Sequence, residues 1–267
     1  MLKHILPLIS QCEHRCYVEV FGGAGHVLFN KEPSRIEVYN DIDEDLVNFF
    51  RVIRDEEKFR IFKDKIELIP YSRVEFEFYR EYEPKDEVEK AIKFVVLVRQ
   101  SFSGNMGTWG YGIKKNQAKA YFNAIQDLDR LKDRIKNVQI ECRDFREVLK
   151  RYDSEETLFY CDPPYVLETR KEKKVYRYEM TDEDHKDLVG MLLKVKGKVM
   201  LSGYRNEIYE VLEKAGWERR DYEVYLCADN PKLCGKRDKR VESLWLSPNF
   251  FEGRESASSF SSFFGVS

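Results

Sequence analysis

Short apolar runs of strand length alternate along this chain with longer segments whose apolar positions recur at helical spacing. The strand-like runs occupy residues 16–21, 35–39, 137–142, 158–161 and 198–202, with two more near 219–227 and 241–246. Asp43 precedes a helical run that extends to Ile53, and Thr181 opens another helix that extends to Leu193. The alternation predicts an α/β fold with a mostly parallel sheet and helices on both faces.

The interval from 55 to 136 departs from this alternation. It is highly charged and rich in aromatic residues, with helical patterns after Pro84 and again over 118–135. Between these patterns, the Gly-rich stretch 101–112 is not expected to form a regular element. The chain therefore divides into a sheet-containing domain, a helical insert and a tail without periodicity that we expect to be disordered. Their predicted ranges are 1–54 with 137–250, then 55–136, then 251–267.

Length and composition narrow the class of protein. The 267 residues suffice for one domain with a large insert. The net charge of -2 means that a nucleic-acid partner would have to be held by local basic patches. No apolar stretch could span a bilayer and no signal peptide is visible. The six cysteines read as reduced thiols of a cytosolic protein, and no Cys/His cluster pairs with Cys12 and Cys16 to make a metal site.

The segment Asp-Pro-Pro-Tyr at 162–165 directly follows the apolar run 158–161. Each proline fixes φ and removes an N–H donor, and the residue before a proline is held extended. The carboxylate of Asp162 and the carbonyl of Pro163 are therefore acceptors that neighbouring N–H groups cannot easily satisfy. With the ring of Tyr165 as a wall, the segment suits a planar group that carries an exocyclic amine, such as a nucleobase. A turn that merely ends a strand is the alternative.

A second motif, Phe-Gly-Gly-Ala-Gly at 21–25, follows the first strand-like run. Small residues there allow a sharp turn and a close approach of a ligand to the backbone. Asp41 follows the second strand about 20 residues later, where an acid can accept hydrogen bonds from ribose hydroxyls. The turn is neither a dinucleotide fingerprint nor a phosphate-binding loop with Gly-Lys-Ser or Gly-Lys-Thr. A nucleoside cofactor without phosphates is favoured, and S-adenosylmethionine is one.

In these motifs and their order, the chain resembles a DNA adenine-N6 methyltransferase of the Dam-like (D12) class. The resemblance implies a Rossmann-like methyltransferase fold that closes with an antiparallel hairpin, and an insert that recognises the target sequence. The matching segments run in the family's order over nearly the whole chain, at 17–25, 39–43, 99–104, 143–145, 162–165, 201–204 and 242–245.

By this resemblance the catalytic residues are Asp162, Pro163, Pro164 and Tyr165. Hydrogen bonds from the adenine amine to Asp162 and to the Pro163 carbonyl would free the nitrogen lone pair for direct methyl transfer. The base must be flipped out of the duplex to reach such a site, and Tyr165 would stack on it.

The cofactor that the resemblance implies is S-adenosylmethionine. Phe21 and the glycines would surround its methionine part, Asp41 would bind the ribose, and Asp144 and Phe145 would contact the adenine. The predicted cofactor-binding set is Phe21, Gly22, Gly23, Gly25, Asp41, Asp144, Phe145 and Asp162. The structural alternatives are a turn built for packing, an N-cap at Asp41, a strand-end cap at Asp144 and a core position for Phe145.

The partner that the resemblance implies is duplex DNA, held by the insert and by basic loops beside the pocket. Charge runs are often only solvated surface, and this is the alternative for each lysine. The predicted DNA-binding residues are Arg99, Ser103, Asn105, Thr108, Tyr111, Lys114, Lys115, Lys173 and Lys174.

Two features depart from the family pattern. The chain has Glu19-Val20-Phe21 where the family usually has Glu-Pro-Phe. Many members also carry a Gly-Gly-Lys or Gly-Ser-Lys segment before the first helix, whereas this chain starts at Met1-Leu2-Lys3-His4. Either that segment is missing or another residue, such as Lys3, takes its place.

Other functions stay open at this point. One is N-methylation of another amine, namely cytosine N4, RNA or protein, although Asp before Pro-Pro-Tyr favours adenine by resemblance. Another is a DNA-binding relative that has lost activity. A cognate restriction endonuclease is a candidate partner, with a phage or solitary enzyme as alternatives. We expect a cytoplasmic, nucleoid-associated protein that acts as a monomer, and its recognition sequence is not readable.

Overall fold

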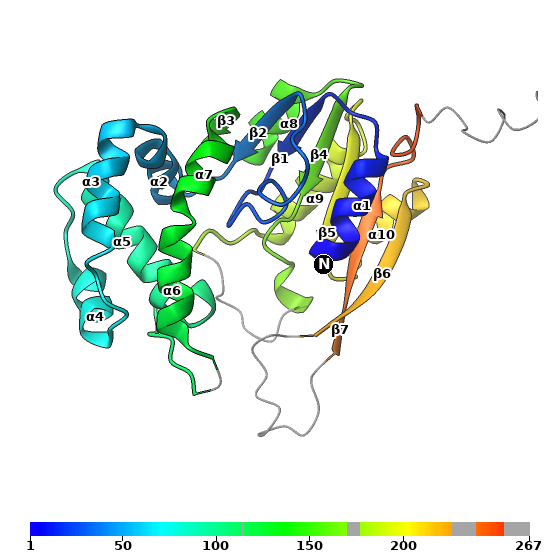
Figure 1. Cartoon of the computed structure of the whole chain (residues 1–267). Helices are drawn as coiled ribbons and strands as arrows, with labels where there is room; N and C mark the ends of the chain where they lie inside the picture. The colour runs from blue at the N-terminus through cyan, green and yellow to red at the C-terminus, as the bar shows by residue number, and fades with distance from the viewer. Residues whose placement is uncertain (114, 170–176, 226–238, 254–267) are drawn as a thin grey trace, which may run out of the picture.

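The computed structural model describes residues 1–113, 115–169, 177–225 and 239–253, which form a sheet-containing body flanked at one end by a group of helices (Figure 1). The strands are β1 (Cys16–Glu19), β2 (Ile36–Asn40), β3 (Val138–Glu141), β4 (Thr157–Cys161), β5 (Lys198–Gly203), β6 (Glu218–Tyr225) and β7 (Lys239–Leu246). Each lies at or within a residue or two of a predicted strand-like run.

Within the described residues these strands form one seven-stranded sheet in the order β3-β2-β1-β4-β5-β7-β6. Neighbouring strands from β3 to β5 are parallel, whereas β7 runs antiparallel to both β5 and β6. The predicted α/β fold with a mostly parallel sheet and a closing antiparallel hairpin is therefore confirmed. The chain order reverses between β1 and β4, and ligands of open parallel sheets bind at the carboxyl ends of the strands beside such a reversal.

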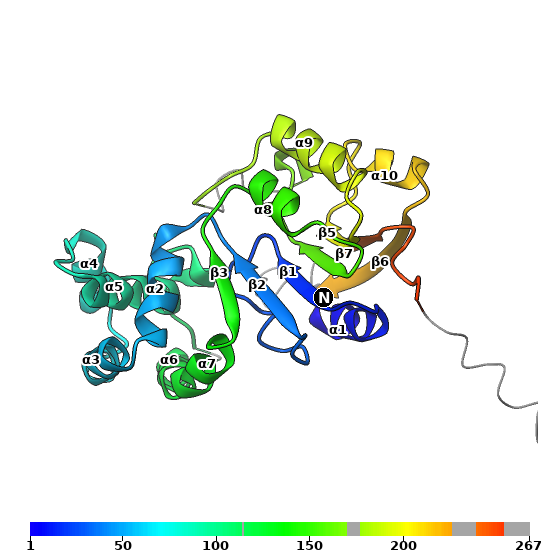
Figure 2. The ribbon, with the colours of Figure 1, turned by 90° about the horizontal axis from the view of Figure 1, so that it is seen from above.

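Both faces of the sheet are buried. Successive side chains of a strand point to opposite faces, so Tyr17 and Tyr160 enter one apolar cluster while Val18 and Phe159 enter another. Figure 2 shows α8, α9 and α10 on one side of the sheet and α1 on the other. The bounds of these helices are α1 (Leu2–Gln11), α8 (Phe145–Tyr152), α9 (Asp182–Leu192) and α10 (Glu210–Lys214).

The remaining α-helices gather beyond the β3 edge of the sheet (Figures 1 and 2). They are α2 (Glu44–Arg54), α3 (Glu56–Ile66), α4 (Arg73–Glu81), α5 (Glu87–Gln100), α6 (Gln117–Gln126) and α7 (Leu128–Ile135). Asp43 caps α2 as predicted, because its side chain accepts a hydrogen bond from the N–H of Asp45. None of the described helices has the length and apolar character that crossing a membrane requires.

The helix predicted over 118–135 is in fact two helices that meet at Asp127. Asp127 has φ -76° and ψ -2°, and its N–H donates to the carbonyls of Asn123 and Ile125 to end α6. Asp is a weak helix former in a helix interior. The hydrophobic period continues across the break, so the periodicity does not reveal it.

The stretch 101–112 contains a short 3-10 turn, η1 (Phe102–Gly104), and an isolated bridge between Ser101 and Trp109. The prediction that it forms no regular element is confirmed. Another such turn, η2 (Leu167–Thr169), follows β4. Residues 254–267 of the predicted tail lie outside the described residues.

Candidate active site

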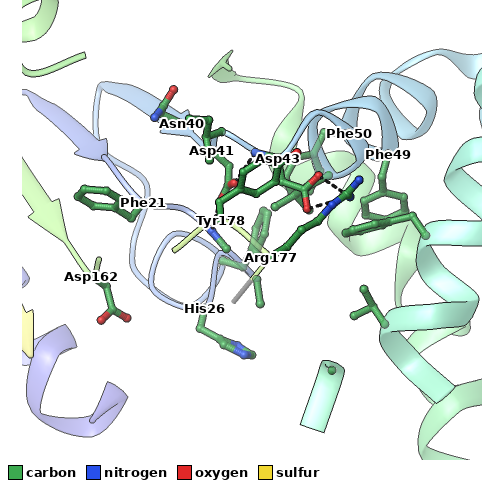
Figure 3. Close-up of a pocket in the computed structure, with 18 of the residues that line it drawn as sticks. Phe21, His26, Asn40, Asp41, Asp43, Phe49, Phe50, Asp162, Arg177 and Tyr178 are labelled. Carbon is green, nitrogen blue, oxygen red and sulfur yellow. Dashed lines mark hydrogen bonds and ion pairs between the residues drawn. The ribbon is translucent and has the colours of Figure 1, made fainter. Parts of the chain in front are cut away.

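A cavity of about 2240 Å³ opens at the carboxyl ends of β1, β2, β4 and β5. Its lining combines loops after these strands, including Phe21 and Asp162, with helices beyond the β3 edge, including Phe94 and Asn123. Figure 3 shows Phe21 and Asp162 on one side of this space and Phe49 and Phe50 on the other. Pockets for one small ligand measure roughly 300–1,000 Å³, so the cavity has room for two ligands side by side.

The glycine turn after β1 needs its glycines for different reasons. Gly23 and Gly25 have φ of 49° and 63°, which side chains rarely tolerate. A Cβ at Gly22 would collide with the ring of Tyr39, and one at Gly25 with the ring of Phe29. Gly23 lines the cavity, whereas Gly22 and Gly25 do not. The turn is therefore compact on its inner side and open toward the cavity at Gly23.

Asp41 is held in place by two backbone donors. Its Oδ2 accepts from the N–H of Gly23 at 2.7 Å, and its Oδ1 accepts from the N–H of Asp43 at 2.8 Å. Burial raises the pKa of Asp41, although both donors favour the charged form. The alternative in which Asp41 caps the next helix is wrong, because Asp43 is the residue that caps α2. Asp41 lines the cavity instead.

Phe21 and Phe145 form an aromatic wall of the cavity, with ring centroids 5.6 Å apart. Phe145 is also a core residue, since only 6% of it is exposed. Asp144 caps α8 by accepting from the N–H of Arg146, and it forms an ion pair with the Arg146 guanidinium at 3.0 Å. Asp144 is therefore a helix cap and Phe145 a core residue, as the structural alternatives expected. Both residues also line the cavity.

Asp162 directly follows β4, and its carboxylate opens onto the cavity. Ser202 in β5 donates its hydroxyl to Asp162 Oδ1 at 2.5 Å. Side-chain hydrogen bonds with Tyr160 and Tyr165 complete a set of three hydroxyls around the carboxylate. Burial raises the pKa of Asp162, and the hydroxyls, with the more distant His26, offset part of that rise by favouring the charged form.

Two tyrosines stand beside this carboxylate. The rings of Tyr165 and Tyr204 meet edge to face, with centroids 4.7 Å apart, and both line the cavity. Arg240 donates to the Tyr204 hydroxyl at 3.3 Å. Pro164 lines the cavity as well, whereas Pro163 is buried and does not. The site thus offers a flat aromatic surface next to an acceptor.

Two of the predicted DNA-binding residues lie on the cavity wall. Arg99 opens onto the cavity near its helical side, and burial lowers its pKa. Asn105 lines the cavity too, but its side-chain carbonyl accepts from the N–H groups of Gly107 and Thr108 at 3.0 and 3.1 Å. Asn105 therefore shapes the turn in which it lies.

Three further predicted DNA-binding residues lie outside the lining of the cavity. Thr108, Tyr111 and Lys115 are exposed, and Tyr111 stacks on Trp109 with ring centroids 6.1 Å apart. Ser103 lies in η1. Lys114, Lys173 and Lys174 lie outside the described residues.

Sequence reasoning assigned no role to several residues of this region. Buried Asn40 donates to the carbonyls of Val20 and Arg143 at 2.9 and 3.0 Å, which joins the ends of three strands. His26 lines the cavity close enough to influence the pKa of Asp162. A register argument would have found Ser202, since a parallel neighbour of β4 places a residue beside Asp162.

One set of ion pairs beside the cavity could not be foreseen from the sequence. Arg177 pairs with Asp43 at 3.2 Å and also with Asp45, which in turn pairs with Lys90 at 3.0 Å. Figure 3 shows Arg177 reaching toward Asp43, with Tyr178 beside it. These partners are more than a hundred residues apart in sequence, so only the folded chain joins them.

Among the described side chains, no three His, Cys, Asp or Glu residues are grouped in a way that could hold a metal ion.

A cavity at the carboxyl ends of the strands, lined by Asp41 and Asp162 beside the reversal of strand order, is the kind of ligand site that open α/β sheets carry. The family model described as D12 class N6 adenine-specific DNA methyltransferase matches residues 1–225, and the chain belongs to that family. The membership in this family that the sequence motifs indicated is thereby confirmed. Members of the family methylate the N6 amine of adenine in DNA, so the prediction of an adenine-specific DNA methyltransferase is confirmed as well.

Two named relatives agree with this membership. The type II methyltransferase M.MjaIII of Methanocaldococcus jannaschii is 28% identical over 217 residues, which cover 71% of this chain and 74% of that protein. The DNA adenine methylase of Vibrio cholerae is 26% identical over 161 residues, covering 58% of this chain but only 57% of the Vibrio protein. A solved structure, a putative RNA methyltransferase from Pyrococcus horikoshii, aligns with a TM-score of 0.39 at 8% identity, over 92% of this chain and 79% of that chain.

Proposed function

We propose that this chain transfers the methyl group of S-adenosylmethionine to the N6 amine of an adenine flipped out of a specific duplex DNA sequence. The observation that carries the proposal is the shared cavity. It joins the Asp41 turn, which suits a nucleoside, to the Asp162 carboxylate, which suits an amine. Its volume of about 2240 Å³ accommodates both ligands together.

The residues present fit the cofactor. Asp41 has a fixed carboxylate facing the cavity, as an acceptor for two ribose hydroxyls requires. Gly23 has no atom within 4 Å of where its Cβ would stand, which leaves open space for a ligand beside the backbone. Phe21 and Phe145 supply the apolar surface that a purine prefers. When bound there, S-adenosylmethionine supplies a methyl group on a positively charged sulfur.

Asp162 would act on the acceptor amine. The N6 lone pair of adenine is delocalised into the ring, which makes the amine a poor nucleophile. A hydrogen bond from the amine to Asp162, which lines the cavity as Pro163 does not, favours a tetrahedral nitrogen with a localised lone pair. Asp162 would stabilise the positive charge that develops on nitrogen as the N–CH3 bond forms and the bond of the methyl group to sulfur breaks, after which N6 would lose one proton. Tyr165 holds the base by stacking, and Phe21, Gly23, Asp41, Asp144 and Phe145 hold the donor in line.

The helices of 55–136 would form the target-recognition insert. They supply the cavity wall opposite the sheet, with Arg99 and Asn105 among the lining residues. A base that enters the cavity from a duplex would pass between this wall and the Asp162 side. Tyr111 and Lys115 of the same insert are exposed and would contact the flanking DNA. Because one relative is named a type II methyltransferase, a cognate restriction endonuclease is a proposed partner.

The decisive experiment measures transfer of labelled methyl from S-adenosylmethionine to unmethylated DNA, followed by nucleoside analysis. We expect N6-methyladenine, and a loss of about 100- to 1,000-fold in rate for Asp162→Ala. The control is Asp153→Ala, which removes a carboxylate that accepts from the N–H groups of Lys196 and Gly197 outside the cavity. N4-methylcytosine, or transfer to RNA or protein alone, would contradict the assigned substrate. Full activity in folded Asp162→Ala would remove the catalytic assignment.

A further inference from the structure

The register of the sheet brings a second polar residue beside Asp162. Strands β4 and β5 are parallel, with Tyr160 opposite Met200 and Cys161 opposite Leu201. The next pair in this register is Asp162 and Ser202. Because side chains alternate along a strand, both lie on the sheet face that also carries the side chain of Tyr160. The hydroxyls of Tyr160 and Ser202 are therefore placed by the backbone on the same side as the carboxylate.

These hydroxyls are buried and committed to the carboxylate. Ser202 is 2% exposed and Tyr160 is 3% exposed. Ser202 donates to Asp162 Oδ1 at 2.5 Å, and Tyr160 has a side-chain hydrogen bond with the same carboxylate. Their two hydroxyls are also within hydrogen-bonding reach of each other. Buried polar groups of this kind are costly unless they are paired, so the arrangement has little freedom to rotate.

The number of donors sets what the carboxylate can still accept. An ionised carboxylate has about four acceptor positions on its two oxygens. Ser202 uses one of them, at 2.5 Å, and the side-chain hydrogen bonds with Tyr160 and Tyr165 use others. The carboxylate also lines the cavity, where an acceptor position can meet a donor that arrives there, as an N6 hydrogen requires.

We propose that Ser202, assisted by Tyr160, is a positioning residue that holds the Asp162 carboxylate with one acceptor position facing the incoming amine. Neither residue lines the cavity, so both act through Asp162 and not on the substrate. The inference rests on the proposed function, because it assigns to Asp162 the role of amine acceptor.

The test uses Ser202→Ala and, as an independent variant, Tyr160→Phe, each of which removes a hydroxyl and little else. With the carboxylate free to rotate, kcat should fall about 10- to 100-fold, as for the loss of a hydrogen bond to a charged group. The KM for S-adenosylmethionine and the Kd for duplex DNA should change less than about 3-fold, since positioning affects the transition state. Ser202→Thr restores the hydroxyl and should recover most of the rate.

A pH profile separates positioning from general damage. A hydroxyl that donates to a carboxylate favours its charged form and lowers its pKa. Its removal should therefore shift the acid limb of kcat to higher pH. Other titratable groups near this carboxylate could also affect the acid limb of the kcat profile. They are Glu19, His26, Tyr160, Cys161, Tyr165 and Glu242. All of them are unchanged in Ser202→Ala, so the shift relative to the native chain belongs to the lost hydroxyl.

The matched control is Ser243→Ala. Ser243 in β7 is 1% exposed and donates to Asp221 Oδ1 at 2.7 Å, but neither residue lines the cavity. It should lose comparable stability and keep its kcat and pH profile. If Ser202→Ala and Ser243→Ala behave alike in kcat, the positioning role is wrong. If the native chain itself transfers no methyl to DNA, the proposed function fails first, which is a distinct result.

Discussion

At the scale of single residues, two buried glutamates on adjacent strands have opposite electrostatic environments. Glu19 in β1 is 2% exposed and Glu37 in β2 is 3% exposed. Burial raises the pKa of Glu19 to about 8, because the hydrogen bonds from Tyr17 and from the N–H of Leu28 compensate only part of its desolvation. Burial alone would raise the pKa of Glu37 as well, but the hydrogen bonds from Arg134 and Lys31 outweigh burial, so the pKa of Glu37 is lowered.

The first consequence is that burial of Glu19 lowers the stability of the folded chain by an amount that depends on pH. Its folded-state pKa of about 8 lies above the ordinary value of 4.5. The folded chain therefore holds a proton that the unfolded chain has lost, and stability falls as pH rises between these two values. Glu19→Gln mimics the protonated acid and avoids this loss. Its free energy of unfolding should exceed that of the native chain by roughly 3 kcal/mol at pH 8 and by little at pH 5.

Glu37→Gln is the control for Glu19→Gln, because Glu37 is a buried glutamate whose pKa is lowered and not raised. It breaks a buried ion pair with Lys31 at 2.5 Å and leaves two cations unpaired. We expect a loss of about 3 kcal/mol at pH 7, which shrinks as pH falls through the lowered pKa of Glu37. Urea unfolding at several pH values measures both variants. A Glu19→Gln variant that loses stability at pH 8 would show that Glu19 is charged in the folded chain.

At the scale of elements, the strands and most helix starts could be predicted because their signals are local. An apolar run of five residues and an Asp before an apolar helix need no knowledge of the rest of the chain. Contacts such as that of Arg177 with Asp43 could not be predicted, because nothing near either residue indicates the other. The hydroxyls around Asp162 could be predicted only in part. Ser202 becomes visible only after β4 and β5 are recognised as parallel neighbours.

The start of α2 allows a test at this scale, because Asp43 serves two elements. It caps α2 through the N–H of Asp45 and pairs with Arg177 at 3.2 Å. Asp43→Asn keeps a capping oxygen and loses the ion pair, which is half-exposed on the arginine side, so it should cost only about 0.5 kcal/mol. Asp43→Ala loses both and should cost about 1–2 kcal/mol. Equal losses in urea unfolding would mean that the cap contributes nothing measurable.

At the scale of the whole molecule, the cavity is the feature that the sequence could not supply. Its two walls come from opposite parts of the fold, the carboxyl ends of the strands and the helices beyond β3. The motifs indicated the first wall, because Asp41 and Asp162 follow strands that lie on either side of β1. The second wall depends on how α5, α6 and α7 pack beside the sheet. Arg99 was predicted to contact DNA, but its place inside the cavity could not be read from its spacing.

The positions of Arg99 and Lys115 allow two contributions of a cation to DNA binding to be measured apart, namely a contact with the phosphates and a contact inside the cavity. The chain carries a net charge of -2, so general attraction to phosphates is weak and individual contacts should be measurable. Lys115 is exposed on the insert, whereas Arg99 lies in the cavity and burial lowers its pKa. A phosphate contact changes affinity for all sequences and contributes about 0.9 to the slope of log K against log salt. Lys115→Gln should therefore reduce that slope by about 0.9 and weaken specific and nonspecific duplexes alike.

Arg99→Gln should behave differently if the flipped base enters the cavity that Arg99 lines, because its contact would then be with the base and not with the flanking phosphates. The salt slope should change little, while kcat falls and discrimination between target and nontarget duplexes narrows. Fluorescence anisotropy at several salt concentrations, with single-turnover methylation of the same duplexes, measures both quantities. Lys186→Gln, on α9 and paired with Glu183 at 2.7 Å, is the control and should change neither. If Arg99→Gln lowers the salt slope as Lys115→Gln does, the duplex backbone itself reaches the cavity, and the helical wall would be a phosphate-binding surface.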